Sequence, residues 1–452
     1  MNFRLLKHVG FASLVAFTAA CASSPTASTG GPAPGTGQLE LFTWWTTGGN
    51  AKAFQAESDA FKAKYPNVSV VLGNQTGGGG SVAKQVIAMR MAANNPPDVF
   101  QGHAGKEIMA TWVRPPGVTD LAQNKLEDIS AIYKQEGWDK TFNSAIVATV
   151  TDHGGIFALP VSVHKENGIF YSKKVFADNS LTPPATLADF YAVGDALLAK
   201  GGIAPIAIGL KDAFSITMIF ADVLLSKASD ANPGMGAQWV TDYWAGKKMA
   251  DDPIVVATVS ELTKLTKYMN PDMATLSYAN ASKKLADGSG AMMMMGDWLS
   301  AVLSSPAPGG SGLTPVTDFD IFPFPGTADT FVAIDDVWVL PKGLAPQDNA
   351  NALAFLRLAG SAAVSTQFAL NKFCVPPRSD IDKTLLSPLA QRAFDETQTL
   401  KITPSMANGM AAPVTYLNNV QAALVAFMTD PTNNPEPSVV SALKSNYPLL
   451  QQ

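Results

Sequence analysis

The chain has 452 residues, enough for roughly two or three domains of typical size, and 47% of them are hydrophobic while only 15% are charged. This composition excludes an intrinsically disordered chain or a coiled coil. The formal net charge of -5 at pH 7, without clustered Lys and Arg, argues against nucleic acid as a partner.

The first residues have the layout of an export signal. Arg4 and Lys7 precede an apolar run over about residues 9–20, which is too short for a membrane-spanning helix. Cys21 follows two alanines and looks like the lipidated cysteine of a bacterial lipoprotein, although Thr18 stands where leucine is usual. We expect residues 1–21 to be the signal peptide and lipobox, with a lipid on Cys21; cleavage after Ala22, giving a free secreted protein, is the alternative.

A polar segment rich in Pro, Gly and Ser follows at residues 22–38, and we expect it to be a flexible tether. No later segment has the eighteen or more apolar residues of a membrane helix, so we expect the body to contact the membrane only through the lipid anchor. Cys374 has no internal disulfide partner if Cys21 is removed or lipidated, so packing must supply the stability.

From residue 39 to residue 113 the sequence predicts alternating strands and helices. Apolar runs predict strands at 39–44, 68–74 and 98–102, and helical periodicity predicts helices from Asn50 to Pro66, at 81–95 with Ser81 as N-cap, and at 104–113. This alternation predicts a parallel sheet with right-handed crossovers.

Ligands of open parallel sheets bind outside the carboxyl ends of the strands, where three loops fall: residues 44–50, 75–80 and 101–105. Trp44 and Trp45 follow a strand end, so both rings are free to turn toward one cleft; the alternative is that one ring caps the core. Gln101 and His103 are two apart on an extended chain and therefore face the same side, although a purely structural His103 is also compatible with the pattern.

The second half of the chain predicts a further α/β region. Residues 154–176 read as two strands across a bend at Pro160, residues 187–285 as mostly helical, and the four methionines at 292–295 as a strand buried on both faces rather than a metal-binding tract. Strands are expected at 318–326 and 330–343, and the last 75 or so residues are mainly helical.

The sequence lacks the motifs of an enzyme. Asp335 and Asp336 are adjacent on a predicted strand and point to opposite faces, which makes a poor acid and base pair. The chain has no G-x-S-x-G or H-E-x-x-H motif, its histidines are scattered, and the glycines at 77–80 lack the Lys and Ser/Thr of a P-loop. We therefore expect no catalytic residues, metal or cofactor, and a set of side chains suited to holding a polyol.

Several motifs in order resemble a known family: FTWWTTGG, NPPDVFQGHAG, GGIFALPVSVH, MGDW and VLPKG. Together they resemble the extracellular solute-binding proteins of bacterial ABC importers for carbohydrates, and are most similar to the binders of glucose, galactose and mannose. The resemblance implies a type II periplasmic-binding-protein-like fold with two α/β lobes and a ligand cleft between them. It implies a first lobe of residues 39–160 and 328–370, a second lobe of 161–327 and 371–452, and three crossovers near residues 160, 327 and 370.

The resemblance also implies ligand-binding residues from both lobes: Trp44, Trp45, Gln101, His103, Tyr278, Trp298, Asp336, Lys372 and Asn408. Tyr278 and Asn408 depart from the residues usual in close relatives, and Asn408 stands where those have a histidine. Simpler roles remain open: Trp298 as a core residue, Lys372 as a solvated charge, and Asp336 as a turn cap or ion-pair partner. His164 could reach the cleft near the hinge, but we favour a structural position for it.

The function that the resemblance implies is capture of a monosaccharide by hinge closure and its delivery to the transmembrane subunits of an ABC permease, by a monomer at the periplasmic or extracellular face of a bacterial membrane. The alternatives are a secreted glycoside-active enzyme, a binding protein for a disaccharide or another polyol, and a lipoprotein adhesin or scaffold.

Overall fold

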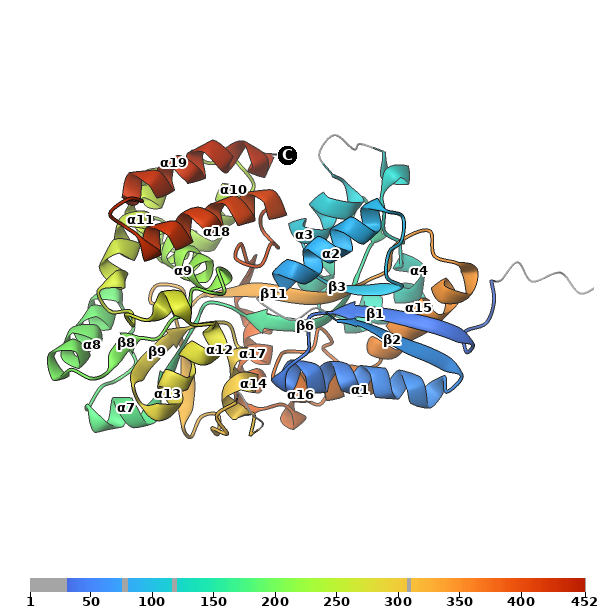
Figure 1. The fold of residues 1–452 in the computed structure, drawn as a ribbon, viewed down its shortest axis with the longest axis horizontal. Helices are drawn as coiled ribbons and strands as arrows, with labels where there is room; N and C mark the ends of the chain where they lie inside the picture. The colour runs from blue at the N-terminus through green and yellow to red at the C-terminus, as the bar shows by residue number, and fades with distance from the viewer. Residues whose placement is uncertain (1–30, 75–79, 116–119, 307–309, 452) are drawn as a thin grey trace, which may run out of the picture.

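The computed structural model describes residues 31–74, 80–115, 120–306 and 310–451. They form two α/β lobes with separate sheets, one at the right and one at the left of Figure 1. The expected two-lobe fold is confirmed. The predicted signal peptide, the lipidation site Cys21 and most of the glycine-rich loop at 75–80 lie outside the described residues.

The first lobe contains a mixed sheet in the order β12-β11-β3-β1-β2, with β6 also paired to β11. Its strands are β1 (Gly37–Thr43), β2 (Val68–Asn74), β3 (Val99–His103), β6 (Leu159–Lys165), β11 (Thr330–Val339) and β12 (Lys401–Pro404). β1 is parallel to β2 and β3, as predicted, whereas β11 runs antiparallel to β3 and β6. Two short strands, β4 (Thr151–Asp152) and β5 (Gly155–Ile156), pair separately.

The helices around this sheet are α1 (Gly48–Lys64), α2 (Ser81–Ala92), α3 (Lys106–Ile108), the π-helix η2 (Met109–Val113), η3 (Leu121–Gln123), α4 (Ser130–Gln135), α5 (Trp138–Thr141), α6 (Ser144–Ala148), α15 (Pro346–Ala359), α16 (Ala362–Lys372), η5 (Lys383–Leu385) and α17 (Pro388–Thr399). The predicted cap of α2 is wrong: Ser81 is the first helical residue, and Gly80 precedes it as N-cap with φ 81°. A left-handed backbone angle there favours glycine. A Cβ on Gly80 would also lie 2.6 Å from the indole of Trp44.

The second lobe contains a sheet in the order β10-β7-β9-β8, made of β7 (Gly168–Ser172), β8 (Ala204–Ile206), β9 (Gly290–Met294) and β10 (Phe319–Pro323). Its helices are α7 (Lys173–Asp178), α8 (Leu187–Lys200), α9 (Phe214–Ala231), α10 (Gly236–Trp244), α11 (Pro253–Thr266), η4 (Met273–Thr275), α12 (Tyr278–Ala281), α13 (Lys283–Asp287), α14 (Leu299–Ser304), α18 (Val414–Thr429), α19 (Glu436–Asn446) and η6 (Tyr447–Gln451).

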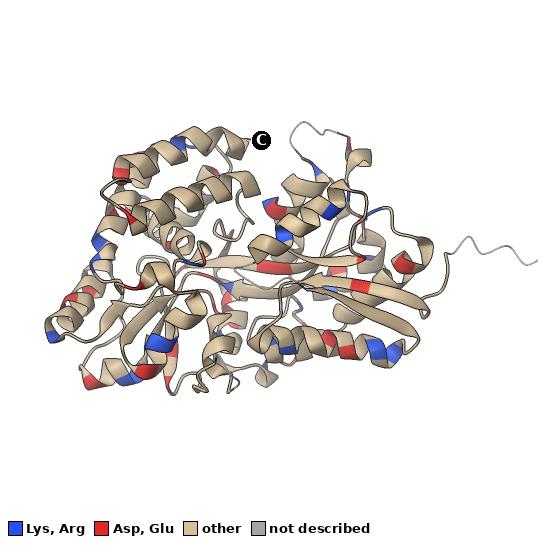
Figure 2. Ribbon diagram, viewed as in Figure 1, with Lys and Arg blue, Asp and Glu red and all other residues tan. Residues whose placement is uncertain are grey.

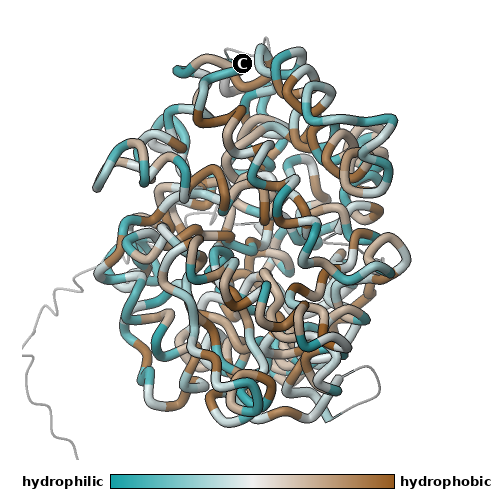
Figure 3. Tube along the Cα trace, turned by 90° about the vertical axis from the view of Figure 1, so that its left-hand side faces the viewer, coloured by the Kyte–Doolittle hydropathy of each residue, from teal (hydrophilic) through white to brown (hydrophobic). Residues whose placement is uncertain are grey.

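The central strands β3, β9 and β11 are buried on both faces, which is why they read as continuous apolar runs, whereas the edge strand β2 leaves Val71 and Leu72 exposed. In β9 and the residue after it, Met292 and Met294 pack into one hydrophobic cluster and Met293 and Met295 into another, and none is more than 2% exposed. The predicted burial of the methionine run is confirmed. In Figure 3 hydrophilic colours mark many of the outer turns, while hydrophobic segments run through the interior.

The bend predicted at Pro160 is wrong. Pro160 lies inside β6 opposite Val337, where a register shift between Asp336 and Val337 marks a β-bulge. A bulge accommodates proline because its missing N–H breaks no ladder bond there. The strand continues pairing to Lys165, so the chain leaves the first sheet only after that residue.

The first two crossings lie side by side and are hydrogen-bonded to each other. Asn167 follows β6, and its side-chain nitrogen donates to Thr327 Oγ1 (2.9 Å) and to the carbonyl of Thr330 (3.0 Å). Its side-chain oxygen accepts from the backbone of Val332 (3.1 Å). One buried amide therefore joins the start of β7 to the start of β11.

The third passage between the lobes comes later than residue 370. β12 pairs with β11, and Leu386 and Phe394 belong to the first lobe's hydrophobic cluster. Met406 is the first residue after β12 that packs into the second lobe's cluster. The lobe boundaries by residue number stay predictions; the contacts above show only which lobe β12, Leu386, Phe394 and Met406 pack against.

Charged residues of both signs are interspersed over the helices of both lobes (Figure 2). Among the described residues, no single helix has both the length and the apolar character of a membrane span; α15 and α16 meet the criterion only as a pair bent by 71°. Cys374 is a buried free thiol.

Candidate functional site

A cavity of about 320 Å³ opens between the two lobes, beside the crossings. Eight of the nine predicted ligand-binding residues line it: Trp44, Trp45, His103, Tyr278, Trp298, Asp336, Lys372 and Asn408. We call this space the inner cavity. The structure thus brings together side chains up to 364 positions apart in the sequence (Trp44 to Asn408, 408 minus 44). Their contact with a ligand stays a prediction.

The ninth residue, Gln101, forms hydrogen bonds with the segment that carries Trp44 and Trp45. Its side-chain oxygen accepts from Thr43 Oγ1 (2.5 Å) and from the backbone N–H of Trp44 (3.2 Å), and its side-chain nitrogen donates to Asp336 Oδ1 (3.2 Å). The Trp45 N–H in turn donates to Thr43 Oγ1 (3.0 Å). Gln101 is only 1% exposed, and it borders a neighbouring cavity rather than the inner one. Its amide therefore fixes the loop that carries both tryptophans.

The two tryptophans occupy different environments. Trp45 is only 3% exposed and packs against Trp338 and Phe368, with ring centroids 5.3 and 5.0 Å away. Trp44 is partly exposed and meets the ring of His103 edge-on at 5.3 Å. Trp45 thus joins the hydrophobic core and reaches the cavity with part of its ring, whereas Trp44 forms a wall.

A buried carboxylate forms the floor of the inner cavity. Asp336 pairs with the Lys372 ammonium and accepts from Ser162 Oγ (2.8 Å) as well as from Gln101. Burial alone would raise the pKa of Asp336, but Lys372 and the nearby histidines hold that pKa well below its usual range. Lys372 also lies over Trp45, with Nζ 4.1 Å from the ring centroid, a cation–π geometry. A solvated Lys372 and a turn-capping Asp336 are therefore wrong, whereas the other simpler role considered for Asp336, pairing with a lysine, is confirmed.

His103 is oriented by a glutamate that the sequence reading did not single out. Glu107 Oε1 accepts from the His103 backbone N–H (2.9 Å), and Glu107 Oε2 lies 2.8 Å from His103 Nδ1. Lys84 Nζ is 2.6 Å from the same Oε2. Burial opposes ionisation of Glu107, yet Lys84 and His103 lower its pKa to about 2. The i, i+4 spacing of His103 and Glu107 is the sequence feature that could have indicated this contact.

His164 lines the inner cavity as well, so the structural position favoured for it is incomplete. Its Nδ1 bonds Asp297, and its Nε2 lies 3.4 Å from Asp336 Oδ2. Burial disfavours its charged form, but Asp297 more than compensates, so the pKa of His164 is raised. Asp297 belongs to the GDW motif, which the sequence reading connected only with Trp298.

The second lobe contributes an aromatic wall. Trp298 contacts His164 edge-on at 5.5 Å and Phe214 at 6.3 Å, and Phe214 contacts Tyr278 at 5.7 Å. A Cβ on Gly296 would lie 2.1 Å from the Trp298 ring, which explains the glycine of the GDW motif. Burial raises the pKa of Tyr278 to about 12, so its hydroxyl stays protonated at neutral pH.

Asn408 connects the cavity to the crossings. Its side-chain nitrogen donates to Glu166 Oε1 (3.1 Å), directly after β6. Burial raises the pKa of Glu166 to about 7, with Ser405 and Asn408 acting in the opposite direction. The side chain of Asn408 therefore touches both the ligand space and the segment about which the lobes are joined.

The geometry does not favour acid–base catalysis at the adjacent aspartates. Asp335 accepts from Thr149 Oγ1 (3.0 Å), away from the partners of Asp336, so the two side chains have separate surroundings, as predicted. Within the part of the chain that the structure describes, no group of three His, Cys, Asp or Glu residues is arranged to hold a metal ion.

Two α/β lobes with a cavity between them, lined from both sides, define a periplasmic-binding-protein-like receptor. The sequence profile of the family described as bacterial extracellular solute-binding protein matches residues 44–365, and the chain belongs to this family. It is 28% identical over 414 residues to an uncharacterized ABC transporter extracellular-binding protein of Pyrococcus horikoshii, covering 90% of this chain and 88% of the relative.

A probable sugar-binding periplasmic protein of Mesorhizobium japonicum is 25% identical over 416 residues, which is 90% of this chain and 93% of the relative. Among solved structures, the bacterial solute receptor AcbH, reported with a preference for β-D-galactopyranose, superposes with a TM-score of 0.76 at 18% identity, over 92% of this chain and 100% of that one. At this identity the structural similarity supports the fold alone.

Proposed function

We propose that the protein is the sugar-binding component of an ABC importer, and that its inner cavity takes a monosaccharide unit of the glucose, galactose or mannose type. The observation that carries this proposal is the combination, in one cavity of about 320 Å³, of aromatic walls from both lobes with a polar floor. The names of relatives such as the probable sugar-binding protein of Mesorhizobium japonicum support the same ligand class.

The physical basis lies in the two surfaces of a sugar ring. Its C–H faces are apolar and suit the rings of Trp44 and Trp298, while its hydroxyl edge suits Asp336, Lys372 and His103. A buried hydroxyl without a partner costs on the order of 1 to 3 kcal/mol. This penalty would let the floor discriminate between epimers that differ in one hydroxyl.

Capture would proceed by hinge closure. A sugar that contacts Trp44 on one lobe and Trp298 on the other stabilises the closed arrangement by its greater affinity for that arrangement. The crossings joined by Asn167 are short, so they permit rotation of the lobes while keeping the β11 floor intact. The proposal involves no bond breaking, and the protein acts as a receptor without catalysis.

Delivery completes the proposed role. The closed form would dock on the transmembrane subunits of an ABC permease, and the receptor would act as a monomer at the periplasmic or extracellular face. Cys21 would carry the lipid that retains it at the membrane, and the segment that follows it would be the tether. The predicted end of the tether at residue 38 is too late, because Gly37 and Gln38 already belong to β1.

Isothermal titration calorimetry on residues 22–452, stripped of carried ligand by unfolding and refolding, tests the proposal. Glucose, galactose, mannose, maltose, cellobiose and lactose form the panel, and we expect saturable binding of at least one. Absence of binding across this panel and the trisaccharides maltotriose and cellotriose would refute a sugar receptor. Release of product from chromogenic glycosides, lost in Asp336→Asn, would favour the enzyme alternative.

A further inference from the structure

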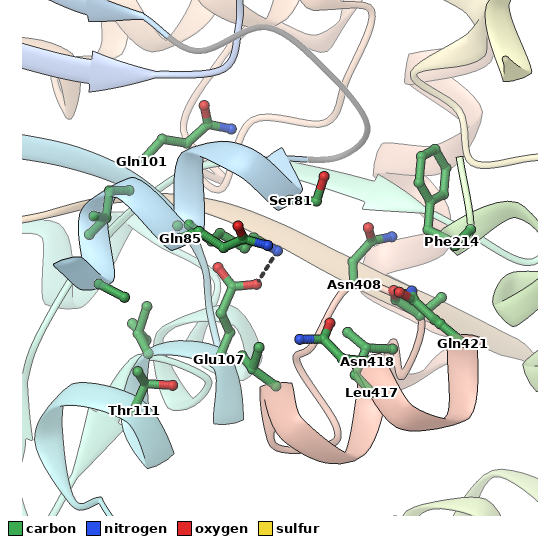
Figure 4. A pocket seen from close by; sticks show the side chains of 18 of the residues that line it. Ser81, Gln85, Gln101, Glu107, Thr111, Phe214, Asn408, Leu417, Asn418 and Gln421 are labelled. Atoms are coloured by element: carbon green, nitrogen blue, oxygen red, sulfur yellow. Dashed lines mark hydrogen bonds and ion pairs between the residues drawn. The ribbon is translucent and has the colours of Figure 1, made fainter. Parts of the chain in front are cut away.

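A second and larger cavity, about 560 Å³ in volume, adjoins the inner one. Asp212, Phe214 and Asn408 line both, so the two spaces are contiguous. The second cavity lies between α2 of the first lobe and α18 of the second, which face each other across it in Figure 4. We call it the outer cavity.

Neutral hydrogen-bonding groups line the outer cavity from both sides. Gln85 on α2 and Asn418 on α18 are solvent-exposed amides, and Figure 4 shows Asn418 directed across the space toward Glu107. Gln421 lies one turn further along α18 and donates to the carbonyl of Ala407 (3.2 Å). Ser81 adds a hydroxyl at the start of α2. Such a set bonds hydroxyl groups as donors and acceptors alike.

Apolar surfaces complete the lining. Trp112 on η2 is partly exposed, and Leu417 and Phe214 present buried side chains on the opposite lobe. Amides beside the rings of Trp112 and Phe214 suit the amphipathic surface of a pyranose ring.

The charges of the outer cavity compensate one another. Lys84 is bound to Glu107 at 2.6 Å, and Lys211 is followed in the chain by Asp212. Asp212 itself accepts from the backbone N–H of Tyr278 (2.8 Å). Because the lining holds two cationic and two anionic residues, its net charge is balanced, and it favours an uncharged ligand over a phosphate or a sugar acid.

We infer that the cargo is a neutral saccharide of at least two units, with one ring in the inner cavity and the remainder between α2 and α18. This inference rests on the proposed function and specifies the length of the ligand. Ligand sites typically measure about 300 to 1,000 Å³, so the inner cavity alone is at the small end and suits a single ring. A monosaccharide would leave the amides of the outer cavity without ligand partners when the lobes close.

Calorimetry with ligands of graded length tests the inference. Glucose is compared with maltose, maltotriose, cellobiose and cellotriose, and galactose with lactose. We expect one disaccharide or trisaccharide to bind at least tenfold more tightly than its constituent monosaccharide. A monosaccharide that binds as tightly as every longer sugar would overturn the inference and leave the proposed function standing. Absence of binding to any sugar would overturn both.

Variants on α18 and α2 locate the extra contacts. Asn418→Trp fills the outer cavity from an exposed position, and Asn419→Trp is its matched control, since Asn419 is exposed beside it but does not line the cavity. Gln85→Trp on α2 has Gln55→Trp on α1 as control. We expect the two cavity variants to weaken the longer sugar at least tenfold while the monosaccharide changes less than twofold, and the controls to change neither.

Alanine substitutions separate lost contacts from hindered closure. Asn418→Ala and Gln85→Ala remove an amide without adding bulk, and we expect each to weaken the longer sugar two- to tenfold with the monosaccharide unaffected. Equal loss for short and long sugars in the tryptophan variants, together with unchanged binding in the alanine variants, would overturn the assignment of the outer cavity.

Discussion

Replacing Trp44 or Trp45 by alanine tests how two neighbouring indoles divide between ligand binding and folding. Trp45 is 3% exposed and enclosed by Trp338, Phe368 and the Lys372 ammonium. Replacing a tryptophan by alanine in such a core costs about 3 to 5 kcal/mol, because the cavity collapses only in part. We therefore expect Trp45→Ala to lower the free energy of unfolding by about this amount.

Trp44 should show the opposite behaviour. It is partly exposed, and its ring contacts are with His103 and Lys84, at 5.3 and 5.5 Å. Because Trp44 only borders two hydrophobic clusters, we expect Trp44→Ala to cost less stability than Trp45→Ala, about 1 to 2 kcal/mol. Loss of its apolar contact with a sugar ring would remove about 1.5 to 3 kcal/mol of binding free energy, or roughly a 10- to 150-fold rise in Kd.

Urea titration of the unliganded variants, with intrinsic fluorescence and circular dichroism as probes, gives stability, and calorimetry with the cognate sugar gives affinity. Trp44→Phe keeps an aromatic face and should recover most of the binding. The reasoning fails if the free energy of unfolding of Trp45→Ala lies within 1 kcal/mol of that of the native protein. It fails equally if the Kd of Trp44→Ala for the sugar lies within twofold of the native value.

Three further outcomes follow from the buried charges. Lys372→Met should lower the free energy of unfolding by about 3 to 5 kcal/mol by leaving Asp336 buried and unpaired, and adding Asp336→Asn should recover part of this in urea titrations. Glu107→Gln should weaken sugar binding as His103→Ala does, and calorimetry on the double variant should show a smaller loss than the sum, since Glu107 acts by orienting His103. Burial raises the pKa of Glu57 to about 8, so the folded state binds an extra proton between about pH 4.5 and 8, and its stability contribution falls as pH rises through that window. Glu57→Gln should therefore be more stable than the native protein at pH 8 and similar at pH 4.5; equal pH profiles of the two proteins would contradict this.

Much of the first lobe was predictable from local patterns. The strand and helix order from Leu39 to Ala92 follows from apolar runs and 3.6-residue periodicity, and the structure has β1, α1, β2 and α2 at those places. The gathering of Trp44 and His103 at one edge follows from the rule that parallel strands present their carboxyl ends together. The ligand-binding role of Lys372, by contrast, was predicted only from the family resemblance.

What the sequence did not predict depends on long-range contacts. Glu107 lies at the start of a short helix, and its salt-bridge partner Lys84 lies on a different helix. Local spacing therefore indicates the contact of Glu107 with His103 but not its contact with Lys84. β12 pairs with β11 and α17 packs into the first lobe's cluster, although neither element has a strong local signal in the sequence. The outer cavity is formed by α2 and α18, which are more than 300 residues apart in the chain (414 minus 92).

The β-bulge beside Asp336 is a local irregularity of β6 next to the floor of the site. Asp336 lies opposite His103 on one side of β11 and opposite Ser162 on the other, and the register shift falls directly after it. The extra residue is Val161 of β6, because Pro160 pairs with Val337 and Ser162 pairs with Asp336. Residues 335 and 336 of β11 therefore still alternate between the two faces of the sheet. Proline at position 160, opposite the shift, leaves the ladder without a donor there, so the sequence feature that was misread as a bend marks the irregularity beside the buried carboxylate.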